Sequence, residues 1–472
     1  MSAETTDPKR LDDLVGALLD AAKAAGADAA DAMASAGESL GVTARAGALE
    51  EAERQESLDF GLRVLIQGAD GVRQASVSAS DPDPAVLSAL AERAVAMAKE
   101  APVDPQAGLA DPSQLIAEIP DLRLLDPAAP PSPDALLETA LALESHALAV
   151  EGVSQAEGAS AGWSRGRVAL AATNGFHGAY DSGSHSISVS AVAGQGGGQG
   201  GGQGGGQGGG QGGGMERDYA FSARRRRADL RALPEVGREA GERAVKRLNP
   251  RKPKTGTYPV IFEPRIASGI AGALTGALNG AAVARGSSFL RAKMGERIAP
   301  ESFQLHEDPT RPGGLGARPF DGEGLPTRAK RLIADGVVSE WLLDLASARK
   351  LGLESNGAAG RSVGGAPSPS AGDVWIAPGA DSPEDLLKSV KAGVWITEMM
   401  GAGFNAVTGD YSRAATGFWI ENGEIAYPIS EFTVAGQVFD MLSAITVAND
   451  LSGDRRIDSP TLLIDGMSVG AE

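Results

Sequence analysis

The sequence predicts an α+β fold, in which an N-terminal domain of helices on an antiparallel sheet precedes a β-rich C-terminal domain. Three observations support this prediction. The 472 residues exceed what one ordinary core organises, apolar residues at helical spacing alternate with strand-like segments in the first half, and short strands dominate the second half. We expect domains at residues 1–248 and 258–472, with the boundary in the proline- and lysine-rich segment 249–260.

The N-terminal domain is expected to contain three helices before a Gly/Gln repeat and one after it. Leu11, Leu14 and Leu18 begin the first apolar stripe, and Asp83-Pro84 is typical of a helix start. Between the helices, the predicted strands and turns are 30–36, 40–44, 58–64, a turn at 68–71, 72–78, a hairpin around Asn174-Gly175, and 215–222; the later helices are 133–150 and 230–248.

The repeat at residues 194–214 consists only of glycine and glutamine. Glycine has high backbone entropy and no side chain to bury, so we expect a flexible coil. Strand-like residues on both sides favour an expanded hairpin loop within the N-terminal domain over a linker between domains.

The C-terminal domain is expected to open with a strand at 260–262 and one closely packed helix at 266–284. Gly272, Gly276 and Gly280, at intervals of four, indicate a helix face that other backbones approach. Farther on, a polar loop at 401–413 precedes a β-hairpin whose turn is Asn422-Gly423. Polar loops held by strands commonly carry binding or catalytic residues.

Composition excludes several classes of function. A net charge of −18 and a pI of about 4.8 make nucleic acid and anionic membranes poor partners. The exception is the run Arg224 to Arg227, interpreted as a solvated helix start. Without cysteine there is no disulfide, thiolate nucleophile or Cys-ligated metal. Segment 266–284 is too rich in Ala and Gly for a good membrane span, and we expect a cytoplasmic protein.

Few residues form a recognisable catalytic constellation. The four histidines include no pair spaced to present two imidazoles from one helix to a metal. Glu398, Asp410 and Glu431 could form a carboxylate site, whereas Asp410, Ser412 and Arg413 could equally bind peptide backbone or simply hold their loop together.

Three blocks in the second half resemble the TldD/PmbA family of metallopeptidases. The longest, at 407–436, reads VTGDYSRAATGFWIENGEIAYPISEFTVAG, and DGEGLPT (321–327) and SARKLG (347–352) resemble other family blocks in the same order. The resemblance implies membership of a peptidase family with two branches that act together as a heterodimer.

The resemblance also implies which branch this chain represents. In the TldD branch a helix carries His-Glu-x-x-x-His, and here Ala271, Gly272 and Gly276 stand at those three positions. We therefore expect the PmbA branch, also called TldE: a subunit that has no catalytic or metal-binding residue and no cofactor of its own, and whose TldD-like partner supplies zinc.

Peptides are the expected substrates, held in a groove by seven residues. These are Asn279, Gly280, Gly409, Asp410, Tyr411, Ser412 and Arg413. Two alternatives stay open. One is an autonomous hydrolase using Asp410, Glu398 or Glu431 in a metal-free or carboxylate-metal site, and the other is a scaffold that binds peptides without taking part in cleavage.

Overall fold

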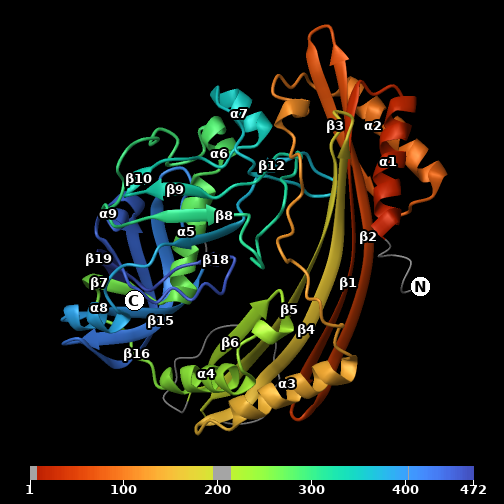
Figure 1. The fold of residues 1–472 in the computed structure, drawn as a ribbon. Helices are drawn as coiled ribbons and strands as arrows, with labels where there is room; N and C mark the ends of the chain where they lie inside the picture. Colours follow the sequence, from red (N-terminus) through yellow and green to blue (C-terminus); the bar gives the residue numbers. More distant parts are fainter. Residues whose placement is uncertain (1–7, 195–213, 402, 472) are drawn as a thin grey trace.

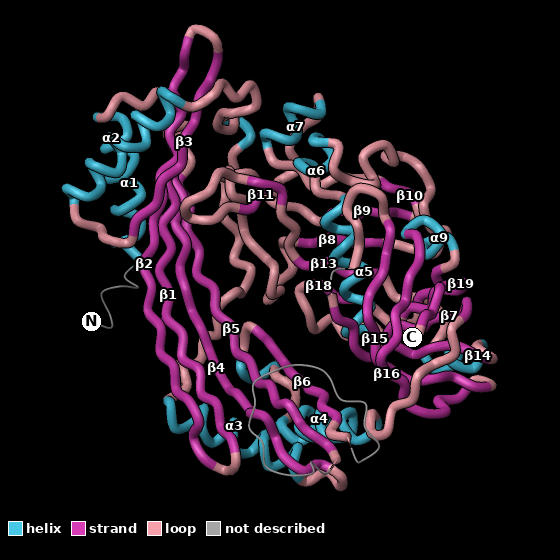
Figure 2. Tube along the Cα trace, turned by 180° about the vertical axis from the view of Figure 1, so that it is seen from behind, coloured by secondary structure: helices cyan, strands magenta, loops and turns pink. Residues whose placement is uncertain are grey.

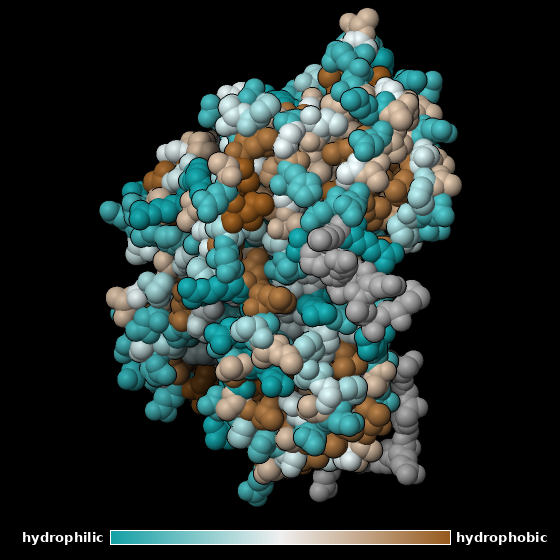
Figure 3. Space-filling model, turned by 45° about the vertical axis from the view of Figure 1, so that its right-hand side comes forward, coloured by the Kyte–Doolittle hydropathy of each residue, from teal (hydrophilic) through white to brown (hydrophobic). Residues whose placement is uncertain are grey.

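The computed structural model describes residues 8–194, 214–401 and 403–471 and has the predicted α+β character. One long antiparallel sheet dominates the first half, and a compact arrangement of smaller sheets and helices forms the second half beside it (Figure 1). The face shown in Figure 3 is largely hydrophilic, with apolar residues in separate patches. None of the helices in the described part of the chain is long and apolar enough to cross a membrane.

The long sheet has the strand order β3-β2-β1-β4-β5-β6, and all neighbours are antiparallel. Its strands are β1 (Ala29–Arg45), β2 (Ala48–Gly68), β3 (Gly71–Ala79), β4 (Val153–Ala172), β5 (His177–Ala193) and β6 (Glu216–Arg224). Seen from behind, its longest strands run the full height of the molecule (Figure 2). Segments 30–36 and 40–44 belong to a single strand, β1, instead of two, because the pairing with β2 and β4 continues through both.

Four helices cover one face of this sheet at its two ends (Figure 1). The helices are α1 (Pro8–Ala24), α2 (Pro84–Glu100), α3 (Pro133–Leu148) and α4 (Leu233–Lys246), with 3₁₀ turns at 112–114 and 227–229. The α1–α2 pair buries alternate β1 residues such as Ala30, Ala32 and Ala34, while α3 and α4 pack on the other end. Asp83 caps α2 through the Ala85 N–H, as its position before Pro84 predicts.

The Gly/Gln repeat connects two neighbouring strands. Ala193 in β5 pairs with Glu216 in β6, so the strands on the two sides of the repeat are neighbours in the sheet. The predicted flexibility of the repeat concerns residues 195–213, which lie outside the described residues. The predicted helix start at Arg224–Arg227 is wrong: Arg224 ends β6, and Arg225 donates to the carbonyls of Gly183 and Leu315, joining the two halves.

A six-stranded sheet that curves onto itself forms the main framework of the second half. Its order is β16-β15-β14-β7-β19-β17, and an additional β16–β19 pairing gives it a barrel-like form. The strands are β7 (Gly256–Phe262), β14 (Ala392–Met400), β15 (Asp410–Glu421), β16 (Glu424–Gln437), β17 (Ile445–Val447) and β19 (Leu462–Gly470).

The remaining strands form a five-stranded sheet and a short two-stranded one. The former has the order β10-β9-β8-β13-β18. The strands are β8 (Leu305–Asp308), β9 (Lys330–Ala334), β10 (Val337–Val338), β13 (Asp373–Ile376) and β18 (Ile457–Asp458), with β11 (Ala359–Gly360) and β12 (Ser368–Pro369) separate; the helices are α5 (Pro264–Ala277), α6 (Gly280–Arg285), α7 (Leu345–Leu351), α8 (Pro383–Ser389) and α9 (Val438–Ser443).

The single helix predicted over 266–284 is in fact two helices, α5 and α6. Asn279 separates them: its side-chain oxygen accepts from the N–H groups of Ala281 (3.0 Å) and Ala282 (3.2 Å) and so caps α6. The N–H of Gly280 meanwhile donates to the carbonyl of Leu342. A local side-chain cap therefore ends the continuous helix that the Ala/Gly composition suggested.

Candidate functional site: a cavity beside helix α5

A cavity of about 350 Å³ lies between α5 and the segment around the start of β15. It is lined by Ile266, Gly269, Ile270, Ala273, Gly276 and Ala277 from α5, by Phe289, and by Gly403, Phe404, Ala406, Tyr411 and Arg413 from the facing segment. The α5 residues recur at intervals of three and four, so they form one face of the helix.

The glycines of α5 leave open space instead of permitting close packing. A Cβ at Gly276 would meet no atom within 4 Å, and one at Gly269 would meet only Arg413 Nη1 at 3.9 Å. At Gly272 the nearest atom would be Ile457 Cδ1, at an ordinary contact distance of 3.7 Å. The predicted approach of a backbone is found only at Gly280, where a Cβ would lie 2.7 Å from the Leu342 carbonyl oxygen.

The opposite wall comes from alternate residues of β15. Tyr411 and Arg413 share one face of the strand, whereas Asp410 and Ser412 point to the other face and are exposed. The Tyr411 ring lies 4.6 Å from that of Phe404, and its hydroxyl donates to the sulfur of Met399. Burial raises the pKa of Tyr411, so the phenol stays protonated at neutral pH.

Arg413 is the only charged side chain among the described residues that line the cavity. It is half-buried, and one terminal nitrogen donates to the Met399 carbonyl at 3.4 Å. Its Nε–H is buried and has no hydrogen-bond acceptor in the described part of the chain. The wall therefore offers a guanidinium whose hydrogen-bonding capacity is not fully used.

The polar loop before β15 is held by its own hydrogen bonds. Gly409 has a φ of +80°, and a Cβ there would lie 2.5 Å from Val438, so this turn requires glycine. Asn405 accepts from the Val407 N–H, and Thr408 donates to the Asp410 carboxylate at 2.6 Å. Gly409 and Asp410 thus shape the loop that presents Tyr411 and Arg413.

The sequence-predicted groove residues separate into two places. Tyr411 and Arg413 line the cavity beside Gly276, while Gly409, Asp410 and Ser412 lie in the adjoining turn and strand. Asn279 and Gly280 are elsewhere, at the start of α6. There the Asn279 amide donates to Pro369 O at 2.9 Å and Gly280 is buried against Leu342 and Leu343.

The residues present do not fit a zinc ion. Zinc is bound in proteins by Cys, His and carboxylate ligands, and the polar side chains in the described lining are those of Tyr411 and Arg413. Of the three positions predicted to correspond to the family's metal motif, Gly276 faces the cavity, Gly272 faces Ile457, and Ala271 is fully buried. None of the three residues has a donor atom in its side chain.

The three carboxylates of the alternative hydrolase site do not converge. Glu398 forms an ion pair with buried Arg247, and Glu431 pairs with Lys252 at 3.5 Å. Glu398 lies beside Thr416 in the β14–β15 pairing, six residues along β15 from Asp410, which corresponds to about 20 Å. Asp410 and Glu398 therefore cannot act on one bond as an acid pair.

Sequence reasoning missed most of the apolar lining. Phe289 and Phe404 come from loops, and Gly269 and Ala273 were overlooked because the four-residue spacing of Gly272, Gly276 and Gly280 shares only Gly276 with the cavity lining. The sequence did hold a usable signal, namely small residues at 269, 273 and 276, which recur at the three- and four-residue spacing of one face.

Family models match three consecutive segments of the chain. They are described as PmbA/TldA metallopeptidase domain 1 (residues 30–98), central domain (126–248) and C-terminal domain (255–471). The chain is 36% identical to the metalloprotease PmbA of Escherichia coli O157:H7 over 448 residues, covering 94% of this chain and 93% of that protein. The chain belongs to the PmbA/TldD family. The first two matched segments contribute strands to one continuous sheet.

Other relatives and solved structures agree with this assignment. A PmbA homologue of Haemophilus influenzae is 33% identical, covering 91% of this chain and 89% of the relative. A putative modulator of DNA gyrase from Bacteroides thetaiotaomicron superposes with a TM-score of 0.86 at 24% identity, covering 99% of this chain and all of the other. TldE from Thermococcus kodakarensis superposes with a TM-score of 0.78 at 22% identity, covering 97% of this chain and all of the other. These likenesses establish the shared fold.

Proposed function

We propose that this PmbA/TldD-family chain is the non-metal-binding subunit of a two-subunit metallopeptidase, and that its α5 cavity holds part of a peptide substrate. A TldD-like partner would supply the zinc. The observation that carries the proposal is the open face of α5, where Gly269 and Gly276 leave space beside Tyr411 and Arg413. Alanine would stabilise the helix at these positions, and glycine brings no closer packing there. A ligand that occupies the space explains why glycine is present.

The lining indicates how a peptide would bind. Phe289, Phe404 and Ile270 offer apolar contact, and Arg413 offers N–H donors that suit a main-chain carbonyl or a carboxylate. Because the described lining of the cavity contains no carboxylate or imidazole, this chain's residues would bind and orient the peptide without moving a proton. Bond cleavage is assigned to the partner subunit.

Reconstitution tests the division of labour. The chain is purified alone and together with a TldD-like protein, and zinc content and cleavage of an unfolded peptide are measured for each. We expect zinc and cleavage only when the partner is present. Stoichiometric zinc or sustained cleavage with this chain alone would contradict the proposal and favour an autonomous hydrolase.

Variants of the cavity distinguish a peptidase subunit from a peptide-binding scaffold. Gly276→Leu should fill the cavity, and Arg413→Met should remove its charge. Both should lower cleavage by the complex about tenfold or more through loss of one or two contacts, while the partner still co-purifies. Arg328→Met, at an exposed arginine paired with Glu340, is the matched control. Unchanged cleavage in both cavity variants would refute a role of this site in the reaction.

A further inference from the structure

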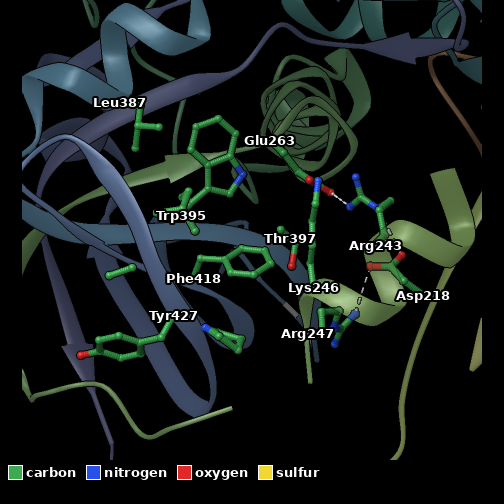
Figure 4. A pocket seen from close by; sticks show the side chains of 13 residues that line it. Asp218, Arg243, Lys246, Arg247, Glu263, Leu387, Trp395, Thr397, Phe418 and Tyr427 are labelled. Carbon is green, nitrogen blue, oxygen red and sulfur yellow. Dashed lines mark hydrogen bonds and ion pairs between the residues drawn. The ribbon is translucent and has the colours of Figure 1, made fainter. Parts of the chain in front are cut away.

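A second cavity, of about 520 Å³, lies between the C-terminal end of α4 and strands β14, β15 and β16 (Figure 4). It is lined by Asp218, Arg243, Lys246, Arg247, Glu263, Leu387, Trp395, Thr397, Phe418, Ile425, Ala426, Tyr427 and Pro428. None of these lines the α5 cavity. Its volume is within the range of about 300–1,000 Å³ that small-molecule sites occupy.

One wall is a row of apolar side chains on neighbouring strands. Trp395 in β14 pairs with Phe418 in β15, which in turn pairs with Pro428 in β16, so the three residues stand side by side on one face. The guanidinium of Arg251 stacks 4.6 Å from the centre of the Tyr427 ring. The wall is therefore built on the sheet and is ready to contact a large apolar group without rearrangement.

The other wall is charged, and most of its charges are paired with each other. Asp218 lies 3.3 Å from Arg247 and 3.4 Å from Arg243, and Arg243 also pairs with Glu263. Lys246 differs, because no ion pair or hydrogen bond of this side chain is found among the described residues. Figure 4 shows it extended across the cavity toward Trp395 and Glu263.

An unpaired ammonium opposite an aromatic wall selects for ligand chemistry. A carboxylate attached to a bulky apolar group satisfies both features, with one negative charge for one free positive charge. A phosphate monoester would bring up to about two negative charges close to Asp218 and Glu263 and would find only one unpaired cation in the described lining. The site therefore suits an apolar monoanion.

We propose that this cavity binds the C-terminal residue of a peptide, with its carboxylate on Lys246 and its large apolar side chain against Trp395, Phe418 and Pro428. The choice of a peptide over another apolar carboxylate rests on the proposed peptidase function. Binding itself requires neither the partner subunit nor cleavage, so the two proposals fail independently.

Calorimetric titration of the purified full chain tests the role of the carboxylate. The probes are N-acetyl-leucyl-phenylalanine as the free acid and as its C-terminal amide. We expect the acid to bind at least tenfold more tightly than the amide, because the amide loses a charge-assisted hydrogen bond. Equal affinities, or no binding of the acid up to millimolar concentration, would overturn the proposal.

Matched variants locate the binding. Lys246→Met should abolish the preference for the acid and Lys246→Arg should restore most of it, whereas Lys350→Met, at an exposed position of α7, should leave it intact. Lys246 is exposed at the last position of α4, so these variants should fold, and an unchanged thermal transition verifies this. Preference retained in Lys246→Met would overturn the assignment of the carboxylate to this residue.

Two further titrations separate the alternatives. Arg413→Met changes the α5 cavity and should leave the affinity for the free acid within about twofold, whereas a loss of tenfold would place the ligand there instead and overturn the proposal. Octanoate presents an apolar carboxylate without a peptide bond. Tighter binding of octanoate than of the dipeptide acid would overturn the peptide as the ligand.

Discussion

Replacing Gly272 by alanine should stabilise the protein, although this glycine is half-buried in the interior of a helix. The residue is in the middle of α5, and a Cβ there would meet Ile457 Cδ1 at 3.7 Å, an ordinary contact. Alanine in a helix interior is favoured over glycine by about 0.8–1 kcal/mol. Since nothing must shift to accept the methyl group, most of this gain should appear in the free energy of unfolding.

The matched comparison is Gly280→Ala, only eight residues away. A Cβ at Gly280 would lie 2.5 Å from Leu343 Cδ2 and 2.7 Å from the Leu342 carbonyl oxygen. The side chain can move but the backbone oxygen cannot do so cheaply, so we expect a loss of about 1–3 kcal/mol from overpacking. The two Gly→Ala substitutions should therefore have opposite signs.

Urea unfolding followed by circular dichroism measures both, with differential scanning calorimetry as a second probe. Gly272→Ala should raise the apparent Tm by about 1–4 °C and Gly280→Ala should lower it. If Gly272→Ala destabilises as much as Gly280→Ala does, the inference that α5 accepts a methyl group beside Ile457 without rearrangement is refuted.

Three further predictions concern stability. Burial raises the pKa of Glu323 from an unperturbed value of 4.5 to about 8, and the Asp321 charge adds to the effect. The folded state therefore holds this proton more tightly than the unfolded state does. The free energy of unfolding should fall by a few kcal/mol as pH rises from about 4.5 to 8. Glu323→Gln should flatten this decline in urea melts at several pH values, and a slope that survives would refute the assignment. Asp31→Ala should cost about 3–5 kcal/mol, because it leaves Arg63 and Arg361 buried without their shared counter-charge, and a loss under 1 kcal/mol would contradict this. Asn279→Ala should lower the free energy of unfolding by about 1 kcal/mol, because it removes the cap of α6. An unchanged melting curve would contradict this prediction.

The sequence was sufficient for the elements whose signals are local. Asp83-Pro84 predicted the start of α2, and Asn422-Gly423 predicted the β15–β16 turn, where both residues have positive φ. The α+β fold class followed from the same periodicities. Strand length was harder to predict, because the alanines and glycines of β1 give only a weak alternation of apolar and polar residues. The strand continues through Gly37 and Gly41 because it pairs with neighbouring strands on both sides.

The candidate site was only partly predictable, because long-range packing decides which loop faces α5. Side chains alternate between the two faces of a strand, so the sequence of β15 could have separated Tyr411 and Arg413 from Asp410 and Ser412. It could not have shown that the first pair faces a helix. The break at Asn279 combines a local side-chain cap with a contact to Leu342, more than 60 residues away, which accepts the Gly280 N–H. No local pattern carries the second of these contacts. The second cavity was missed altogether, since α4 and β14–β16 are far apart in the sequence.

On the two proposals, the cavities would divide the tasks of binding a peptide according to the charges that each contains. Beside α5, the lining has one guanidinium, Arg413, and otherwise suits uncharged groups. Beside α4, an aromatic row stands opposite the ammonium of Lys246. Both cavities draw lining residues from β15, Tyr411 and Arg413 near its start and Phe418 farther along. Because Phe418 is seven positions after Tyr411, about 23 Å of strand lies between them. A peptide that engaged both would have to be longer than a few residues, which makes peptide length a property that joint titration of the two sites can measure.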